Sequence, residues 1–284
     1  MTTGEDPEVT PKAGSSTKGN EVRPPTLQGV SRAFGVLEAL AANPMRPSEL
    51  SAVLGISWAT LHRTLAQLEA DEFIQRDPAG SYHVGRKMWL LGSTYLVGHQ
   101  LLELAVPLLS RAVGDVPNAV LQLVERSGDD SVVLYSHEAA TGEMITRTTY
   151  GHHFPLHCGS KGFVLLAGSP RDDIDDYLSR PLISLTAETL TDPSQIRERL
   201  NEVRDGGHAV TVGDVQSFTG SVSAPVFDAS GAVQACVCAV VRRSVLTGAQ
   251  RENTIEVVLR LAQSLSLGLG WSPIAHAKAS KRRP

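Results

Sequence analysis

Cysteine is scarce in this chain of 284 residues, and the three that occur are Cys158, Cys236 and Cys238. An odd number of thiols, after an N-terminus without the apolar core of a secretory signal, argues against a disulfide framework and favours a reducing cytoplasm. No apolar run approaches the roughly 20 residues of a membrane span, and no repeat recurs at a solenoid or propeller period. We therefore expect a cytoplasmic globular protein, long enough for two domains.

Charge is distributed unevenly along the chain. Residues 1–27 are rich in Pro, Gly, Ser, Thr and charged side chains, which predicts a disordered N-terminal arm. Residues 28–90 carry six basic and six acidic side chains, whereas residues 91–270 carry thirteen basic and twenty acidic ones. This acidic excess argues against a nucleic-acid groove along the larger part of the chain. The last fourteen residues, 271–284, carry four basic and no acidic groups and predict a solvated basic tail.

Residues 28–86 show the pattern of a winged helix-turn-helix domain. Apolar spacing predicts helices over about 30–41, 47–54 and 58–70, with Gly55 suited to end the second helix in the left-handed conformation. Two short strands around a Pro-Ala-Gly turn follow within residues 73–84. The order of these elements, three helices and then a hairpin, predicts a DNA-binding module.

The third predicted helix has two contrasting faces. Leu61, Leu65 and Leu68 recur at the spacing of one buried face. Two small residues and three polar ones lie opposite, namely Ala59, Ala66, His62, Arg63 and Gln67. Small residues let a helix lie deep in the major groove, and the polar ones can reach base edges or phosphates. A solvated face on a structural helix is the alternative, but the wing that follows favours DNA recognition.

Further DNA contacts are predicted around this helix. Ser48 and Ser57 are the expected N-caps of the second and third helices, and Ser57 and Thr60 can donate to phosphates there. Trp58 lies at the edge of the leucine stripe and either packs on the helices or contacts DNA. Arg76, in the wing, is either a phosphate or minor-groove contact or a solvated charge. The full predicted DNA-binding set is Ser48, Ser57, Trp58, Ala59, Thr60, His62, Arg63, Gln67 and Arg76.

The sequence pattern changes after residue 86. Residues 87–113 are apolar on a broad helical face that Gly92, Gly98 and Pro107 interrupt, and we interpret 87–105 as a linker helix. Residues 106–270 then form a second domain, in which strand-like and helix-like segments alternate. The strand-like segments are NAVLQLVE, DSVVLYSHEA, EMITRTTY, HAVTVGD, GSVSAPVFD and AVQACVCAVV. This pattern predicts an α+β domain with a mostly antiparallel sheet flanked by helices.

Several of these segments together resemble one family. SRAFGVLEAL, SELSAVLGISWATLHRTLAQLEADEFIQRD and the wing ending in YHVG resemble the DNA-binding domain of the IclR family of bacterial transcriptional regulators. GHHFPLHCGSKGFVLLAG and GGHAVTVGDVQSFTGSVSAPVFDASGAVQA resemble two signature regions of that family's effector domain. The resemblance covers about residues 28–270. It implies a GAF-like α/β effector domain, a homodimer or dimer of dimers, and promoter binding modulated by a small molecule.

An effector site is expected where the helix after residue 158 begins. Gly159 and Ser160 start this helix, whose unpaired N–H groups and positive dipole end favour a carboxylate. By the resemblance, a small organic acid lies there beside an acidic residue and polar groups from nearby strands. The resemblance implies Cys158, Gly159, Ser160, Asp214, Ser221 and Cys238 as effector-binding residues, and the predicted set also includes Cys236. Alternatively, Cys236 and Cys238 are small buried hydrophobes and Asp214 closes a loop.

Departures from the family pattern bear on the ligand. Glu is often found in the family where this chain has Asp214, Ala where it has Cys158 and Lys where it has Phe163. Hydroxyl residues are usual in the family at the positions of Cys238 and Val240. A pocket with fewer hydroxyls favours a less polar acid, one that bears an aromatic or alkyl group.

Other functions use the same residues. The three cysteines, with His152, His153 or His157, can supply ligands for a metal- or thiol-responsive regulator, although no CxxC pair occurs. Cys158 beside His157 can be read as a catalytic pair, but adjacent side chains rarely meet. A winged helix can also bind a protein partner. We predict no enzyme and no cofactor, but a repressor or activator whose two recognition helices read a pseudo-palindromic DNA operator.

Overall fold

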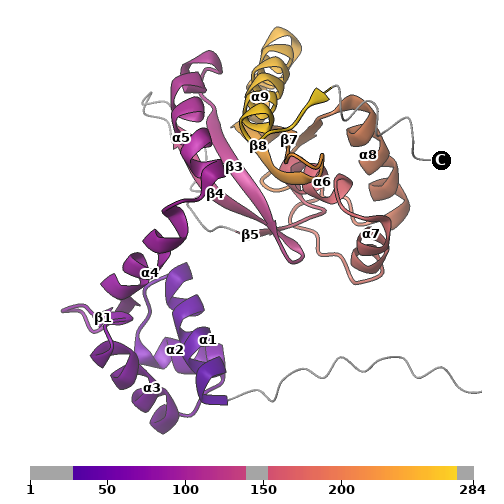
Figure 1. The fold of residues 1–284 in the computed structure, drawn as a ribbon. Helices are drawn as coiled ribbons and strands as arrows, with labels where there is room; N and C mark the ends of the chain where they lie inside the picture. The colour runs from indigo at the N-terminus through magenta and orange to yellow at the C-terminus, as the bar shows by residue number, and fades with distance from the viewer. Residues whose placement is uncertain (1–27, 139–152, 274–284) are drawn as a thin grey trace, which may run out of the picture. The chain divides into compact units, whose positions relative to one another are not determined.

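The computed structural model describes residues 28–138 and 153–273. The chain divides into two compact units, residues 1–95 and 96–284, and each unit has a hydrophobic core of its own (Figure 1). No helix in the described ranges is both long enough and apolar enough to cross a membrane.

The first unit is a small helical domain with a β-hairpin. Before α4 (Arg86–Leu96), its elements are α1 (Gln28–Ala42), α2 (Pro47–Leu54), α3 (Trp58–Ala70), β1 (Ile74–Arg76) and β2 (Tyr82–Val84). The strands pair antiparallel with Gln75 opposite His83, and Tyr82 also bridges to Met45 in the loop after α1. The three helices and the wing therefore occur in the predicted order.

The core of this unit explains why the helices pack as they do. Leu50 of α2 and Leu61 and Leu65 of α3 are fully or almost fully buried with Ile74 of the wing. Gly55 separates α2 from α3 in the left-handed conformation, with φ 62°, which costs glycine little because it has no Cβ.

Of the two predicted N-caps, Ser57 occupies the N-cap position of α3 and Ser48 does not occupy that of α2. Ser48 does not cap α2, because the helix already begins at Pro47, a residue whose fixed φ suits the first helical position. The Glu49 carboxylate instead accepts a hydrogen bond of 2.6 Å from the backbone N–H of Arg46. Ser57 directly precedes α3 as predicted, but its hydroxyl donates to Thr60 Oγ1 at 3.0 Å and caps no backbone N–H.

The segment predicted as a linker forms two helices, α4 (Arg86–Leu96) and α5 (Gln100–Ala112). The break lies at Gly98, which has φ 78°, while Gly92 and Pro107 lie inside helices. The boundary that we placed between residues 105 and 106 therefore falls within α5.

Within the described residues, the second unit is built on a six-stranded antiparallel sheet with the order β5-β4-β3-β8-β7-β6. The strands are β3 (Val120–Ser127), β4 (Asp130–Glu138), β5 (His153–Pro155), β6 (Ala209–Val212), β7 (Thr219–Phe227) and β8 (Val233–Arg242). The central strand β8 pairs with β3 on one side and β7 on the other. The sequence did not predict β5, and the strand predicted for EMITRTTY lies outside the described residues.

Helices cover both faces of this sheet, as Figure 1 shows. α5 and α9 (Gly248–Gly268) pack on one face, while α6 (Gly159–Ala167), α7 (Arg171–Leu178) and α8 (Pro193–Gly206) pack on the other. Short 3₁₀ turns, η1 (Val113–Asp115) and η2 (Arg243–Val245), follow α5 and β8. Along β8, Val237 faces the first layer and Cys236 and Cys238 face the second, because successive side chains alternate across a strand. The predicted α+β fold is confirmed.

Candidate DNA-binding surface and effector site

The two faces of α3 differ in the structure as they do in the sequence. Leu61, Leu65 and Leu68 are buried against α1, α2 and the wing. The residues predicted to lie opposite are all exposed, namely Ala59, His62, Arg63, Ala66 and Gln67. Arg63 forms no hydrogen bond or ion pair with any residue that the structure describes, so its guanidinium is available to a ligand.

Side chains at the two ends of α3 contact neighbouring side chains of the same unit. Trp58 is 55% exposed, so it does not pack in the core, and its ring lies 4.7 Å from the His62 ring in an edge-to-face contact. At the other end, the Gln67 amide donates to the Asp71 carboxylate at 2.8 Å. Trp58 and His62 therefore form one aromatic pair on the open surface of the helix.

Contacts among its own side chains stabilise the wing. Asp77 accepts a hydrogen bond of 2.8 Å from the Ser81 N–H and lies 3.0 Å from His83 Nε2. The Ser81 bond and then the His83 contact lower the pKa of the Asp77 carboxyl. The guanidinium of Arg76 lies 5.7 Å from the centre of the Tyr82 ring, which it covers. Arg76 is thus positioned on the hairpin and remains exposed.

In the second unit, the start of α6 meets the strands β6 and β7. Gly159 begins the helix with φ 79°, and its backbone N–H donates to Asp214 Oδ2 at 2.8 Å. The next N–H, that of Ser160, donates to Thr211 Oγ1 at 3.1 Å. Burial raises the pKa of the Asp214 carboxyl, and the bond from Gly159 opposes that rise. The helix N-terminus therefore already holds one carboxylate, which comes from the chain itself.

A cluster of hydroxyl groups lies beside this contact. Ser160 Oγ is 2.8 Å from both Ser221 Oγ and Ser223 Oγ, and Thr211 Oγ1 is 3.1 Å from Ser221 Oγ. Ser160 and Ser223 are fully buried. These bonds connect α6 to neighbouring strands through side chains that are far apart in the sequence.

A small cavity of about 30 Å³ adjoins the cluster. It is lined by Phe154, Gly159, Lys161, Asp214, Val215, Gln216, Thr219, Gly220, Ser221, Cys238 and Val240. One or two water molecules fill such a volume, so an organic acid needs some of these side chains to move. The lining includes Gly159, Asp214, Ser221 and Cys238 of the predicted effector set.

The other predicted effector residues lie close by without lining the cavity. Ser160 is turned toward the serines of β7, Cys158 precedes α6 and is fully buried, and the Cys236 thiol donates to the Lys161 carbonyl at 3.8 Å. The family pattern could indicate this neighbourhood but not which side chains face the space.

Lys161 was missed by the sequence reasoning. Its side chain is only 5% exposed, and its ammonium lies over the Phe154 ring at 3.9 Å from the centre. Burial lowers the pKa of this amine, and the cysteines of β8 and Asp214 oppose the change. One signal was present in the sequence: Lys161 is the single charged residue of the helix GSKGFVLLA, in which Ser160 is the only other polar side chain.

The three cysteines and His157 lie in buried surroundings. Burial raises the pKa of Cys158 to about 12 and also raises the pKa values of Cys236 and Cys238, so their thiolates are disfavoured. His157 Nδ1 lies 2.7 Å from the Tyr177 hydroxyl, and its Nε2 lies 2.8 Å from the Ile183 carbonyl. Within residues 28–138 and 153–273, no three His, Cys, Asp or Glu side chains are grouped as metal ligands. His152, a predicted alternative ligand, lies outside these ranges.

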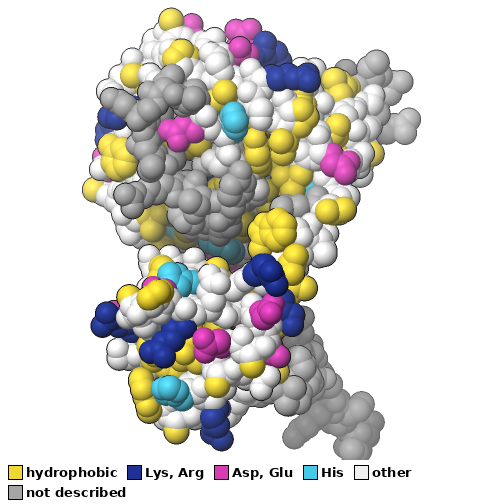
Figure 2. Space-filling model, turned by 90° about the vertical axis from the view of Figure 1, so that its left-hand side faces the viewer, with side chains coloured by type: hydrophobic (Ala, Val, Ile, Leu, Met, Phe, Trp, Pro, Cys, Tyr) yellow, Lys and Arg dark blue, Asp and Glu magenta, His cyan; other side chains and the backbone are white. Residues whose placement is uncertain are grey.

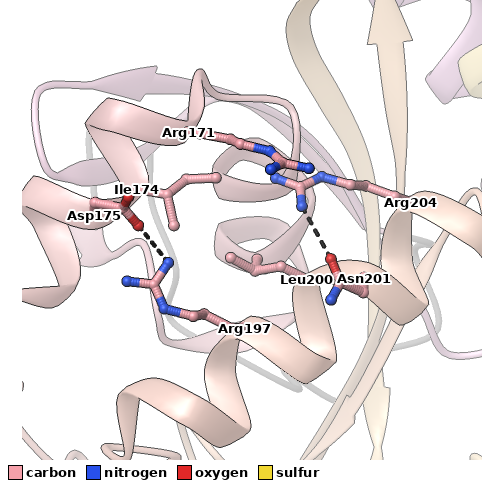
Figure 3. A pocket seen from close by; sticks show the side chains of 7 residues that line it. All are labelled: Arg171, Ile174, Asp175, Arg197, Leu200, Asn201 and Arg204. Carbon is pink, nitrogen blue, oxygen red and sulfur yellow. Dashed lines mark hydrogen bonds and ion pairs between the residues drawn. The ribbon is translucent and has the colours of Figure 1, made fainter. Parts of the chain in front are cut away.

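A larger cleft of about 280 Å³ lies between α7 and α8 (Figure 3). Its lining residues are Arg171, Ile174, Asp175, Arg197, Leu200, Asn201 and Arg204. Asp175 is ion-paired with Arg197, and Arg204 donates to Asn201 Oδ1 at 3.2 Å and to the Ala167 carbonyl at 2.9 Å. These contacts join the two helices to each other and to α6, which gives Arg197 and Arg204 a structural role.

Comparison with known proteins matches both units. A family model described as the bacterial transcriptional regulator IclR C-terminal matches residues 93–267, and one described as the HVO_A0261 N-terminal domain matches residues 25–87. The DNA-binding transcriptional repressor YiaJ of Escherichia coli (strain K12) is 26% identical over 271 residues, which are 93% of this chain and 96% of that protein.

Solved structures share the fold over nearly the same length. An IclR transcriptional regulator from Alicyclobacillus acidocaldarius has a TM-score of 0.77 at 24% identity, over 86% of this chain and all of the other. An IclR homolog from Microbacterium hydrocarbonoxydans, described as complexed with 4-hydroxybenzoate, has a TM-score of 0.74 at 22% identity over 85% and 98%.

The C-terminal family match spans more than half of the 284 residues, and the curated relative is similar over almost the whole chain. The predicted family is therefore confirmed: the chain belongs to the IclR family of bacterial transcriptional regulators.

Proposed function

We propose that this protein is a DNA-binding transcriptional regulator that reads its operator with the exposed face of α3. The observation that carries this proposal is the pairing of a buried leucine face with an outer face that combines small side chains with an arginine that bonds to no described residue. A helix of this kind approaches the major groove closely through Ala59 and Ala66, and Arg63 is placed to pair with a guanine edge or a phosphate.

The same unit supports a homodimer on a two-fold operator. α4 exposes large apolar side chains, among them Trp89 at 70%, Leu91 at 52% and Tyr95 at 58%. Yellow side chains lie open at the level of α4 on the face drawn in Figure 2. Contiguous exposed apolar side chains on a monomer commonly mark an interface. Two copies joined through α4 read half-sites that lie one helical turn, or a multiple of it, apart.

An effector of the small organic-acid class is proposed for the cavity beside α6. Lys161, which lines this cavity, supplies a positive charge for an anion, and the buried hydroxyl cluster lies beside it. The structural neighbour from Microbacterium hydrocarbonoxydans, complexed with 4-hydroxybenzoate, is consistent with an aromatic acid in this class. The apolar lining by Phe154, Val215 and Val240 suits such a body.

The test is selection of genomic DNA fragments by the full-length protein, with Arg63→Ala and Arg32→Ala as variants. Arg32 lies on α1 and is hydrogen-bonded to Gln28 at 3.0 Å, so its replacement controls for loss of one positive charge in the same unit. We expect a recurring palindromic motif for the wild type and Arg32→Ala. Arg63→Ala should bind that motif about 1–3 kcal/mol more weakly if Arg63 contacts a base.

Two other results carry different meanings. Equal weakening of Arg63→Ala on the motif and on random DNA would make Arg63 a phosphate contact. Absence of any enriched motif, with and without added organic acids, would overturn the proposal and favour a protein partner for the winged helix.

A further inference from the structure

Lys161 is buried, which is unusual for a lysine. It lies in the first turn of α6, between the buried hydroxyl cluster and the strand β5, and it lines the cavity. The aromatic face of Phe154 contacts its ammonium, and the residues that the structure describes give this ammonium no hydrogen bond or ion pair. A buried charge without an anion is costly to fold.

The two backbone donors at the start of α6 are already occupied. The first two N–H groups of α6, those of Gly159 and Ser160, already donate to Asp214 and Thr211. An acid that enters the cavity therefore finds these donors satisfied. The three N–H donors of the Lys161 ammonium, in contrast, have no hydrogen-bond acceptor among the described residues.

We propose that Lys161 is the counter-ion for the carboxylate of the effector, and that it makes the site selective for acids with one carboxylate and an apolar body. This inference rests on the proposed effector function. Charge explains the preference for one carboxylate, because Lys161 and Asp214 line the same cavity and a second carboxylate of the ligand would face Asp214. The walls formed by Phe154, Val215 and Val240 take the apolar part.

The contact between Lys161 and Phe154 holds the ammonium in place before the ligand arrives. A cation over an aromatic face is attracted by the ring, and this attraction is stronger where water is excluded. Because the ammonium is already desolvated, an incoming carboxylate gains a charge-assisted hydrogen bond without displacing a full hydration shell. An uncharged amide of the same shape forms a weaker hydrogen bond with the ammonium.

The experiment compares acids with their amides on three full-length proteins: wild type, Lys161→Met and Lys87→Met. Lys87→Met is a matched control, because Lys87 of α4 also lies over an aromatic ring, that of Phe73 at 4.8 Å, but outside the cavity. The probes are acetate, benzoate and 4-hydroxybenzoate with acetamide, benzamide and 4-hydroxybenzamide, and the readouts are calorimetric Kd and the shift in melting temperature.

We expect the wild type and Lys87→Met to bind at least one acid about tenfold or more tightly than its amide. Lys161→Met should lose this preference while its affinity for the amide stays similar. Lys161→Gln serves as a second variant, polar but uncharged, and should behave like Lys161→Met.

Failure of the inference can be separated from failure of the proposed effector function. An acid that binds Lys161→Met as tightly as the wild type would overturn the role of Lys161 and leave the organic-acid class standing. If no acid binds the wild type at millimolar concentration, both the counter-ion role and the acid class are overturned.

Discussion

The carboxylate of Asp214 accepts a 2.8 Å hydrogen bond from the backbone N–H of Gly159, 55 residues earlier in the chain. This bond fastens the start of α6 to the segment that follows β6. Asp214 is only 8% exposed, so little water would reach the backbone N–H of Gly159 if the Asp214 carboxylate were removed. The contact therefore stabilises the effector unit as well as shaping its cavity.

Replacement of Asp214 separates the hydrogen bond from the charge. Asp214→Ala leaves the Gly159 N–H without an acceptor and should lower the free energy of unfolding by about 1–3 kcal/mol. Asp214→Asn keeps an oxygen that can accept the Gly159 hydrogen bond. It also removes the carboxyl group, whose pKa burial raises because the charged form is disfavoured there. The stability of this variant should therefore lie close to that of the wild type. Urea denaturation measures both, and equal stability of the alanine variant and the wild type would contradict this role.

Lys161 should affect stability in a pH-dependent way. Burial lowers the pKa of the folded amine below its ordinary value of 10.5, so folding is penalised while the amine is protonated in both states. Lys161→Met should therefore be more stable than the wild type at neutral pH. The difference should shrink as the pH rises through the lowered folded value toward 10.5, because the folded wild type then loses its proton first. Denaturation at neutral and alkaline pH checks this, and a pH-independent difference would argue against a buried charge.

Gly85 is expected to tolerate no side chain. A Cβ at this position would lie 2.3 Å from the Glu72 carbonyl oxygen and 2.8 Å from the Phe73 carbonyl carbon, both backbone atoms. Gly85→Ala should destabilise the winged-helix unit by about 1–3 kcal/mol or more. Gly92→Ala, in α4 with nothing within 4 Å of the added atom, is the control and should gain up to about 1 kcal/mol of helix stability. Thermal unfolding of the two variants distinguishes the clash from a general effect of alanine.

The proposed dimer can be tested through α4. Trp89→Arg places a charge where the side chain is 70% exposed, so the folded unit should be unaffected while the mass in solution falls from dimer to monomer. Ile183→Arg, 57% exposed in the other unit, is the matched apolar control and should leave the mass unchanged. Sedimentation or light scattering measures the mass, and a Trp89→Arg protein that keeps the wild-type mass would remove α4 from the interface.

Local patterns predicted the first unit well. The leucine spacing and the Ser57 and Gly55 boundaries predict α3 as Trp58–Ala70, because helix periodicity and turn chemistry act over a few residues. The Ser48 cap was wrong for an equally local reason, since Pro47 and Glu49 together satisfy the helix start one residue earlier.

The effector site depends on long-range pairing and was less predictable. The antiparallel pairing of β6, β7 and β8 brings Thr211, Ser221 and Cys238 to the start of α6. No spacing rule along the chain specifies that registry, so the family pattern indicated the neighbourhood alone. Lys161 illustrates the limit, because only the packed structure shows that its ammonium lies in a cavity and not at the surface.

The burial of every thiol in the chain makes the protein convenient for site-specific labelling. All three cysteines are buried, and their raised pKa values keep them protonated at neutral pH, so thiol-reactive dyes have no native target in the folded molecule. A single introduced cysteine, such as Ser57→Cys at the exposed start of α3, would then carry the dye alone. The wild-type background therefore suffices for fluorescence reports of operator binding, with no cysteine-free variant to be made first.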